Sequence, residues 1–189
     1  MTMGLRAFLA GLLMVFAAPG ARAAVEISFF SHELGDTFPH AFIRLRGTDD
    51  RVGAKVENAY GFTAVTVSPA VLMGSVHGEI LSSKPAYIAK SNEHFRFTLT
   101  DLEYDDILRG VHKWRTLKQP SYNLNRQNCV FFVADMAVLL GMTVPMPKAL
   151  MKKPRSFTDS LVTANRAWLT ARGATLLREP PAVATARRR

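Results

Sequence analysis

The sequence predicts an α+β fold, a small and mostly antiparallel sheet packed against two or three helices. Several stretches of the first half alternate between apolar and polar residues, with the period of two that is typical of strands. The second half carries longer apolar stretches bounded by residues that start and stop helices. No Gly-rich phosphate loop and no internal repeat occur between them, so these two observations decide the fold class.

The predicted strands lie mainly in the first half. Residues 25–30 form the first strand, and the second begins at His40, directly after Pro39, where no ladder hydrogen bond is lost. Residues 47–50 have the composition of a hairpin turn, and the return strand covers 54–60. Residues 61–67 extend that strand or start another, and 76–82, 87–89 and 93–99 are further candidates. Alternation places the side chains of the second strand on two faces: His40, Phe42, Arg44 and Arg46 on one, Ala41, Ile43 and Leu45 on the other.

The predicted helices follow. Thr100 and Glu103 have the spacing of a capping box, in which each side chain bonds the backbone of the other. The helix that they open ends before Pro120. A second helix covers 130–140, is apolar except for Asp135, and stops at Gly141. A last helix is expected over 156–170.

Residues 1–23 have the parts of a secretory signal peptide: the positive Arg6, a short apolar run and the cleavage pattern Ala21-Arg22-Ala23. We therefore expect export across the inner membrane to the periplasm, with an uncleaved membrane anchor as the alternative. Residues 24–179 have the usual size of one domain, and 180–189 are expected to be a disordered basic tail.

The chain is basic, with a formal net charge of +9. Such a charge suits anionic polymers and anionic envelope surfaces. No zinc-finger, helix-turn-helix or ribonucleoprotein signature accompanies it, so nucleic acid is not an expected partner. We expect neither a cofactor nor a metal, and the sequence does not predict the oligomeric state.

Cys129 is the only cysteine. It follows a polar, turn-like segment, 121–128, and opens the predicted apolar helix. The free N–H groups and the positive dipole of a helix start favour a thiolate over a thiol. This position therefore suits a nucleophile, whereas the alternative interpretation is a small buried hydrophobic residue.

A cysteine nucleophile needs a base, and the base needs an orienting group. Among five histidines, His40 is favoured because it opens a strand whose hairpin partner returns Glu57 or Asn58 toward it. His32, on a polar segment that could close over a site, is the competing base. An adjacent pair on a strand points to opposite faces, so only Glu57, the first choice, or Asn58, the second, can serve.

The ordered set of Pro39-His40-Ala41-Phe42-Ile43, a capped helix, Tyr122-Asn123-Leu124 and Asn128-Cys129-Val130-Phe131 resembles the circularly permuted branch of the papain-like superfamily. That branch contains NlpC-type cell-wall amidases and lecithin–retinol-acyltransferase-like proteins. The resemblance covers about residues 38–141. It implies a permuted papain-like fold with Cys129 as nucleophile, His40 as base and a polar residue from the return strand, Glu57 or Asn58. The Cys129 N–H, helped by Tyr122 or Asn125, would hold the oxyanion.

These residues lead to three hypotheses. The first is an exported cysteine hydrolase that cleaves an amide bond, with peptidoglycan stem peptides as the substrate class, through an acyl-cysteine intermediate. The second is an acyltransferase or thioesterase that acts on lipid acyl groups. The third is a non-catalytic envelope protein that binds an anionic polymer or a protein partner.

Overall fold

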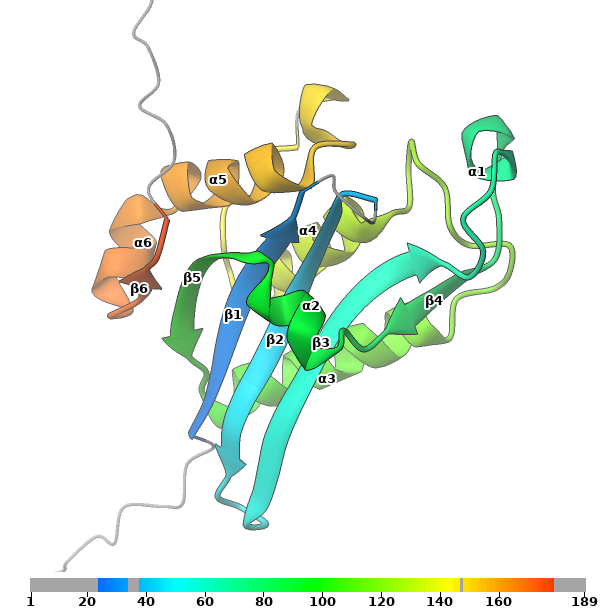
Figure 1. Ribbon diagram of the computed structural model, residues 1–189. Coiled ribbons are helices and arrows are strands. Elements are labelled where there is room, and N and C mark those ends of the chain that lie inside the picture. The colour runs from blue at the N-terminus through cyan, green and yellow to red at the C-terminus, as the bar shows by residue number, and fades with distance from the viewer. Residues whose placement is uncertain (1–23, 34–37, 147, 179–189) are drawn as a thin grey trace, which may run out of the picture.

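The computed structural model describes residues 24–33, 38–146 and 148–178. The predicted signal peptide, 1–23, and the predicted tail, 180–189, lie outside the described residues. The described chain forms one six-stranded antiparallel sheet of order β4-β3-β2-β1-β5-β6 (Figure 1). Its strands are β1 (Ala24–His32), β2 (His40–Asp49), β3 (Ala54–Ala64), β4 (Gly78–Leu81), β5 (Asn92–Thr98) and β6 (Thr175–Leu176).

The helices cover the two faces of the sheet unequally. Three longer helices contribute to the main core on one face: α3 (Asp101–Arg115), α4 (Cys129–Leu139) and α5 (Pro154–Ala164). The short α2 (Pro85–Ala89) lies on the opposite face (Figure 1). The α+β prediction is confirmed. The remaining helices are short: α1 (Ala70–Met73), the 3-10 turn η1 (Lys148–Leu150) and α6 (Arg166–Ala171). No helix in the described part of the chain is both long and apolar enough to cross a membrane.

The alternation predicted for β2 explains both faces. Ala41, Ile43 and Leu45 are fully buried in the main core against the helices. Phe42 points the other way and stacks on Phe30, with ring centroids 5.0 Å apart, in a small second cluster under α2. Each fully buried Ile, Leu or Phe side chain stabilises the fold by about 1.5–3 kcal/mol. The side-chain pattern therefore fixes which face of the strand meets the helices.

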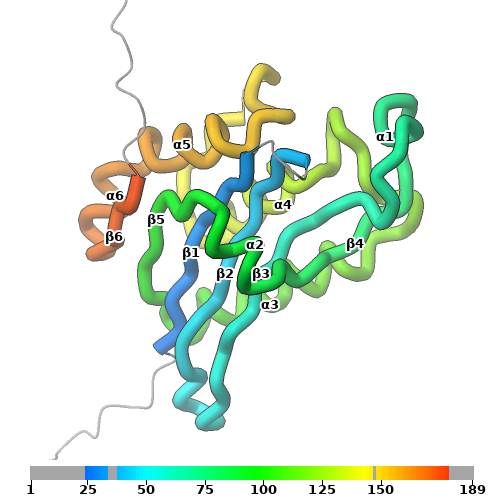
Figure 2. The backbone as a smooth tube through the Cα atoms, viewed as in Figure 1, coloured from blue at the N-terminus to red at the C-terminus, as the bar shows by residue number. Residues whose placement is uncertain are grey.

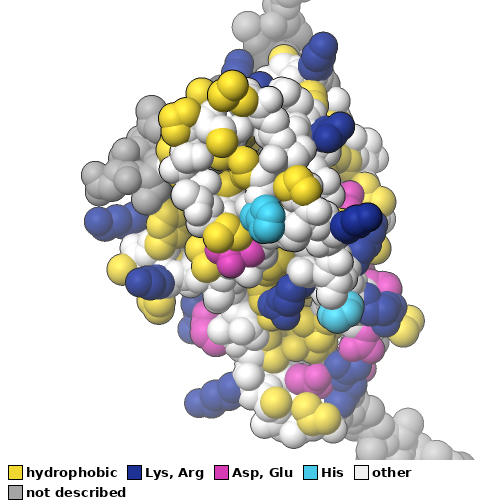
Figure 3. Space-filling view, turned by 90° about the vertical axis from the view of Figure 1, so that its right-hand side faces the viewer, with side chains coloured by type: hydrophobic (Ala, Val, Ile, Leu, Met, Phe, Trp, Pro, Cys, Tyr) yellow, Lys and Arg dark blue, Asp and Glu magenta, His cyan; other side chains and the backbone are white. Residues whose placement is uncertain are grey.

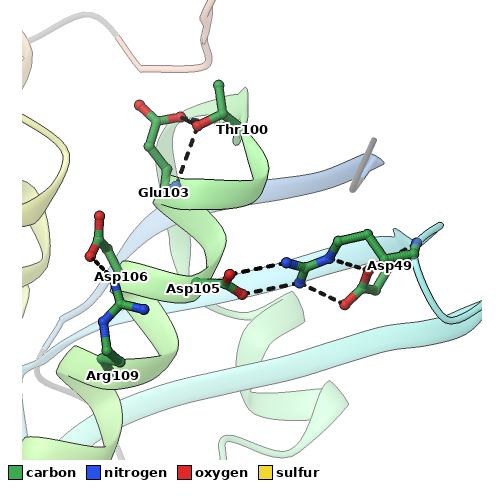
Figure 4. A network of polar contacts seen from close by, with 7 residues as sticks. Asp49, Thr100, Glu103, Asp105, Asp106 and Arg109 are labelled. Atoms are coloured by element: carbon green, nitrogen blue, oxygen red, sulfur yellow. Dashed lines mark hydrogen bonds and ion pairs between the residues drawn. The ribbon is translucent and has the colours of Figure 1, made fainter. Parts of the chain in front are cut away.

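Polar contacts hold the far end of the β2–β3 hairpin against α3 (Figure 4). Arg51, in the hairpin turn, donates to Asp49 on β2 and to Asp105 on α3, at 2.9 and 3.0 Å. At the start of α3, the predicted capping box is present: the Glu103 N–H donates to Thr100 Oγ1, and the Thr100 N–H donates to Glu103 Oε2. The Arg51 contacts therefore tie the hairpin turn to the first turns of α3.

Two local expectations were wrong. Residues 87–89 were expected in a strand but lie in α2, because Pro85 stands in the first helical turn, where its fixed φ favours a helix. The expected helix over 156–170 is divided into α5 and α6 at Asn165. The Asn165 side chain donates to the Leu161 and Thr143 carbonyls and accepts from the Thr143 N–H, which ties this break to the loop after α4.

One irregularity of the sheet matters for the site. The pairing of β2 with β3 stops at Ile43 and Tyr60, and β3 continues beyond it by pairing with β4. The backbone trace shows β3 bending away from β2 at this end (Figure 2). We call the opening between Ala41 on β2 and Phe62 on β3 the strand gap. The strand gap leaves the first residues of β2 without a ladder partner on the β3 side.

Candidate functional site

The start of α4 is held in place by Asn128. This N-cap residue has an extended backbone, and its Oδ1 accepts hydrogen bonds from the N–H groups of Val130 and Phe131. Its Nδ2 donates to the carbonyls of Leu124, at 2.8 Å, and Met151, at 2.9 Å. The side chain is almost fully buried. One amide side chain thus accepts from N–H groups at the helix start and donates to carbonyls in two loops. It therefore fixes the position of the next residue, Cys129.

Cys129 is the first residue of α4, and its thiol lies beside the strand gap. Three backbone N–H groups lie close enough to the sulfur to act against the rise of its pKa: its own, that of Val130 and that of Ala41. The Cys129 N–H is one of the free N–H groups of a helix start, whereas the Val130 N–H also donates to Asn128 Oδ1. The Ala41 N–H lies in the part of β2 that has no partner on β3, so the divergence of the strands leaves a donor that the sulfur uses.

The expected thiolate is not the resting state. Burial raises the pKa of the Cys129 thiol to about 11, although the three N–H groups act in the opposite direction. The residue is only 5% exposed, and the loss of hydration disfavours the charged form more than the helix start favours it. Near neutral pH the site therefore holds a thiol, which can react only if a base removes its proton.

His40 lies at the strand gap on the α2 face of the sheet, where its ring stacks on Phe42 with centroids 6.1 Å apart, whereas α4 and Cys129 pack on the opposite face. His40 precedes Ala41, so the peptide that joins the two residues lies at the sulfur. A Cβ atom added at Gly61 of β3 would lie 2.2 Å from His40 Nε2, so the imidazole fills the space that the missing side chain leaves. Burial, and secondarily the charge of His32, lower the pKa of His40 to about 4. The imidazole is neutral at pH 7 and can accept a proton.

The structure does not bring Glu57 or Asn58 to His40. Glu57 pairs with Arg46 in the β2–β3 register, forms ion pairs with Arg44 and Arg46, and is exposed. Asn58 pairs with Leu45. The register, which starts at Asp49 and Ala54, places both residues toward the hairpin turn, whereas His40 is at the opposite end of β2. Glu57 precedes Gly61 by four positions, about 13 Å along a strand.

His32 is the polar neighbour that His40 has instead. The two residues pair directly in the β1–β2 register. The His32 ring stacks on Tyr87 of α2, with centroids 4.2 Å apart, and its Nδ1 is 3.0 Å from Ser91 Oγ. His32, the competing base of the sequence analysis, is therefore held on the α2 face of the sheet beside His40.

The two oxyanion candidates differ in position. Tyr122 pairs with Val76 through two backbone hydrogen bonds of 2.9 Å and packs against Phe62. Burial raises the pKa of Tyr122, and the charge of Cys129 acts in the same direction, so its hydroxyl is a neutral donor near the sulfur. Asn125 is exposed in the turn before α4, where its N–H donates to Asn123 Oδ1. Tyr122 is the candidate that lies at the site.

A second polar cluster, not predicted from the sequence, joins β1, β5 and α5. Ser31 Oγ lies 2.7 Å from His94 Nε2, and His94 Nδ1 lies 2.9 Å from Asp159 Oδ1, without the alignment of a hydrogen bond. Burial lowers the pKa of His94 to about 4 and raises that of Asp159. Ser31 and His94 are fully buried, which denies this Ser–His–Asp arrangement to a substrate. A shift of register between Phe29 and Phe30 turns His94 inward, and no sequence pattern signals that shift.

Comparison with known proteins adds no assignment to this geometry. A scan against protein-family models finds no match. A search of curated proteins finds none either, and no solved structure matches. The candidate site therefore rests on its own geometry: a buried thiol at the start of α4, three N–H groups close to its sulfur, and a neutral imidazole at the strand gap on the other face of the sheet.

Proposed function

We propose that this protein is a cysteine hydrolase that cleaves an amide bond, with Cys129 as nucleophile and His40 as base. The observation that carries the proposal is that the Ala41 N–H lies close to the Cys129 sulfur, and His40 is the residue directly before Ala41 on β2. Acyl transfer by this pair requires the imidazole, which lies on the α2 face, to reach the thiol through the strand gap, next to the N–H donors.

The protonation states define the first step. Because the thiol and the imidazole are both neutral, His40 takes the thiol proton as the sulfur attacks the carbonyl carbon. The electron pair of the carbonyl moves to its oxygen. The Cys129 N–H and the Tyr122 hydroxyl are the donors available to that oxyanion, because the Val130 N–H already donates to Asn128 Oδ1. Removing one such donor costs about 2.7–4 kcal/mol in comparable sites.

The later steps return the proton and release the products. Protonated His40 gives its proton to the leaving nitrogen as the C–N bond breaks, which leaves an acyl group on Cys129. A water molecule then attacks the thioester while His40 accepts a proton from it. The carboxylic acid leaves, and the thiol takes back its proton. The predicted export and the resemblance to cell-wall amidases support peptidoglycan stem peptides as the substrate class.

One observation favours a second candidate function. A nearly buried thiol with a raised pKa is what a non-catalytic envelope protein would contain. In that case Cys129 packs as a small apolar residue, and the basic surface binds an anionic polymer or a partner. This candidate predicts that the thiol reacts slowly and that substituting His40 does not change how the rate of the thiol reaction depends on pH.

The test combines turnover with trapping. The wild-type protein, Cys129→Ala and His40→Gln are incubated with stem peptides and with fatty acyl esters, and adducts on Cys129 are identified by mass spectrometry. We expect a peptidyl adduct and turnover only with the wild type, and folded but inactive variants by circular dichroism. His112→Gln, at an exposed position of α3, is the matched control and should stay active.

The outcomes separate the candidates. A fatty acyl adduct would assign acyl transfer or thioester cleavage on lipids instead of amide hydrolysis. Full activity in Cys129→Ala would refute every mechanism that uses this thiol. No adduct with either substrate, together with slow alkylation of wild-type Cys129 at every pH tested, would support the non-catalytic protein.

A further inference from the structure

An open hollow lies beside the start of α4. Its volume is about 630 Å³, within the range of small-molecule sites. Its lining residues come from the turn before α4 and from the segment around η1: Asn125, Lys148, Ala149, Met151, Lys152 and Lys153. Three of these six side chains are lysines and none is acidic, so the hollow is strongly positive.

The positive charge of this hollow is not neutralised within the described chain. Lys148, Lys152 and Lys153 are exposed, and none of them forms an ion pair with a described residue. Elsewhere basic side chains do have partners: Arg44 pairs with Glu57, and Arg51 pairs with Asp105. Like charges that line one hollow repel each other, and an anion that enters it removes the repulsion.

The hollow is connected to the candidate site through Asn128. The Asn128 side chain donates to the Leu124 carbonyl, next to Asn125, and to the carbonyl of Met151, which lines the hollow. The same side chain caps the helix that begins with Cys129. The wall of the hollow and the nucleophile are therefore fixed by one residue, and a ligand in the hollow lies next to the start of α4.

We propose that the lysine-lined hollow binds an anionic group, a carboxylate or a phosphate, on the substrate whose acyl group reacts at Cys129. This assignment rests on the function proposed above and adds the charge of the substrate. Lysine ammonium groups are flexible point charges without the rigid fork of arginine. The hollow therefore selects for negative charge more than for the shape of one anion, and binding should weaken as salt is added.

The first experiment measures binding without chemistry. Full-length Cys129→Ala protein is titrated by calorimetry, at low salt, with a γ-glutamyl peptide, the matched glutaminyl peptide and pyrophosphate. The test variant carries Lys148→Gln, Lys152→Gln and Lys153→Gln. The matched control carries Lys55→Gln, Lys84→Gln and Lys90→Gln, which remove the same charge at exposed positions outside the hollow. Even in bulk water one nearby charge changes an affinity about fivefold, so we expect about a tenfold or larger loss in the test variant only.

The second experiment measures delivery to the nucleophile. Protein with Cys129 intact is alkylated with bromoacetyl-glutamate or with bromoacetyl-glutamine, and the ratio of the two rates is compared among the wild type, the test variant and the control. We expect the acidic reagent to react faster in the wild type and in the control, and this preference to disappear in the test variant and at high salt.

Each result has a defined meaning. Equal affinity for acidic and neutral peptides, or an equal loss in the test and control variants, would overturn the anion site. Anion binding that depends on the three lysines, without any alkylation of Cys129, would keep the anion site but refute its link to thiol chemistry. Binding of pyrophosphate but not of the glutamyl peptide would assign a phosphate, and the reverse would assign a carboxylate.

Discussion

Gly61→Ala tests whether the His40 imidazole occupies the strand gap. A Cβ at this position would lie 2.2 Å from His40 Nε2 and 3.1 Å from Phe42 Cβ. The first distance requires the ring to leave its place, whereas the second requires a shift of only a few tenths of an ångström. The substitution should therefore act mainly through one side chain, and that side chain can be removed independently.

The magnitude follows from two opposing effects. Forcing extra atoms into a packed site costs about 1–3 kcal/mol, and replacing glycine by alanine regains about 0.4–1 kcal/mol by restricting the unfolded chain. We expect Gly61→Ala to lower the free energy of unfolding by about 1–2 kcal/mol in the wild type. In a His40→Ala background the main overlap is gone, so the cost should fall to about zero. The coupling energy between the two positions is then about 1–2 kcal/mol.

The assay is urea unfolding of the four proteins of this double-mutant cycle, together with the rate of Cys129 alkylation at pH 7. Gly74→Ala is the control, because nothing lies within 4 Å of an added Cβ there, and it should change little. We expect slower alkylation in Gly61→Ala because the base has left the strand gap. Equal costs of Gly61→Ala with and without the His40 ring would refute the placement of that ring, and with it the assignment of His40 as base.

Two further predictions concern the buried polar groups around the site. The folded-state pKa of His94, about 4, is below its ordinary value of 6.5. Between these two pH values the unfolded state therefore binds more protons than the folded state. The free energy of unfolding should accordingly fall by about 3 kcal/mol as the pH drops from 6.5 toward 4. Urea unfolding between pH 4 and 8 should show a shallower loss in His94→Gln, and an unchanged slope would contradict this linkage. Asn128→Ala should lower the free energy of unfolding by about 2–4 kcal/mol, because the cap and the partners of two carbonyls are lost. Asn128→Asp keeps the cap but puts a negative charge near Cys129, so the pH midpoint of thiol alkylation should rise, and a lower midpoint would exclude this electrostatic effect.

Local patterns predicted much of the fold because local physics decides it. The alternation of β2 and the capping box at Thr100 are present as expected, since each depends on residues a few positions apart. The end of the β2–β3 pairing at Ile43 could not be predicted, because β3 leaves β2 to pair with the distant β4. The strand predicted over 87–89 was wrong for a different reason, because Pro85, two residues before Tyr87, starts a helix.

The candidate site was predictable in part for the same reason. The placement of Cys129 at a helix start follows from the turn and the apolar run on either side of it. Its protonation state does not, because desolvation depends on the burial that the whole fold creates. Glu57 was misplaced because hairpin register, counted from the turn, puts it beside Arg46. The burial of His94 could not be predicted either, because a single inserted residue in β5 turns its side chain inward.

The divergence of β2 and β3 also has a mechanical consequence. Beyond Ile43 and Tyr60 no described ladder pair crosses from one strand to the other, and each strand keeps its bonds to its outer neighbour, β1 or β4. The strand gap can therefore widen without breaking a hydrogen bond between β2 and β3, whereas a regular sheet would lose one hydrogen-bonded pair after another. The Ala41 amide lies at this opening, close to the Cys129 sulfur. Deuterium exchange at that one amide should accordingly report, without any substrate, whether the thiol is free or modified.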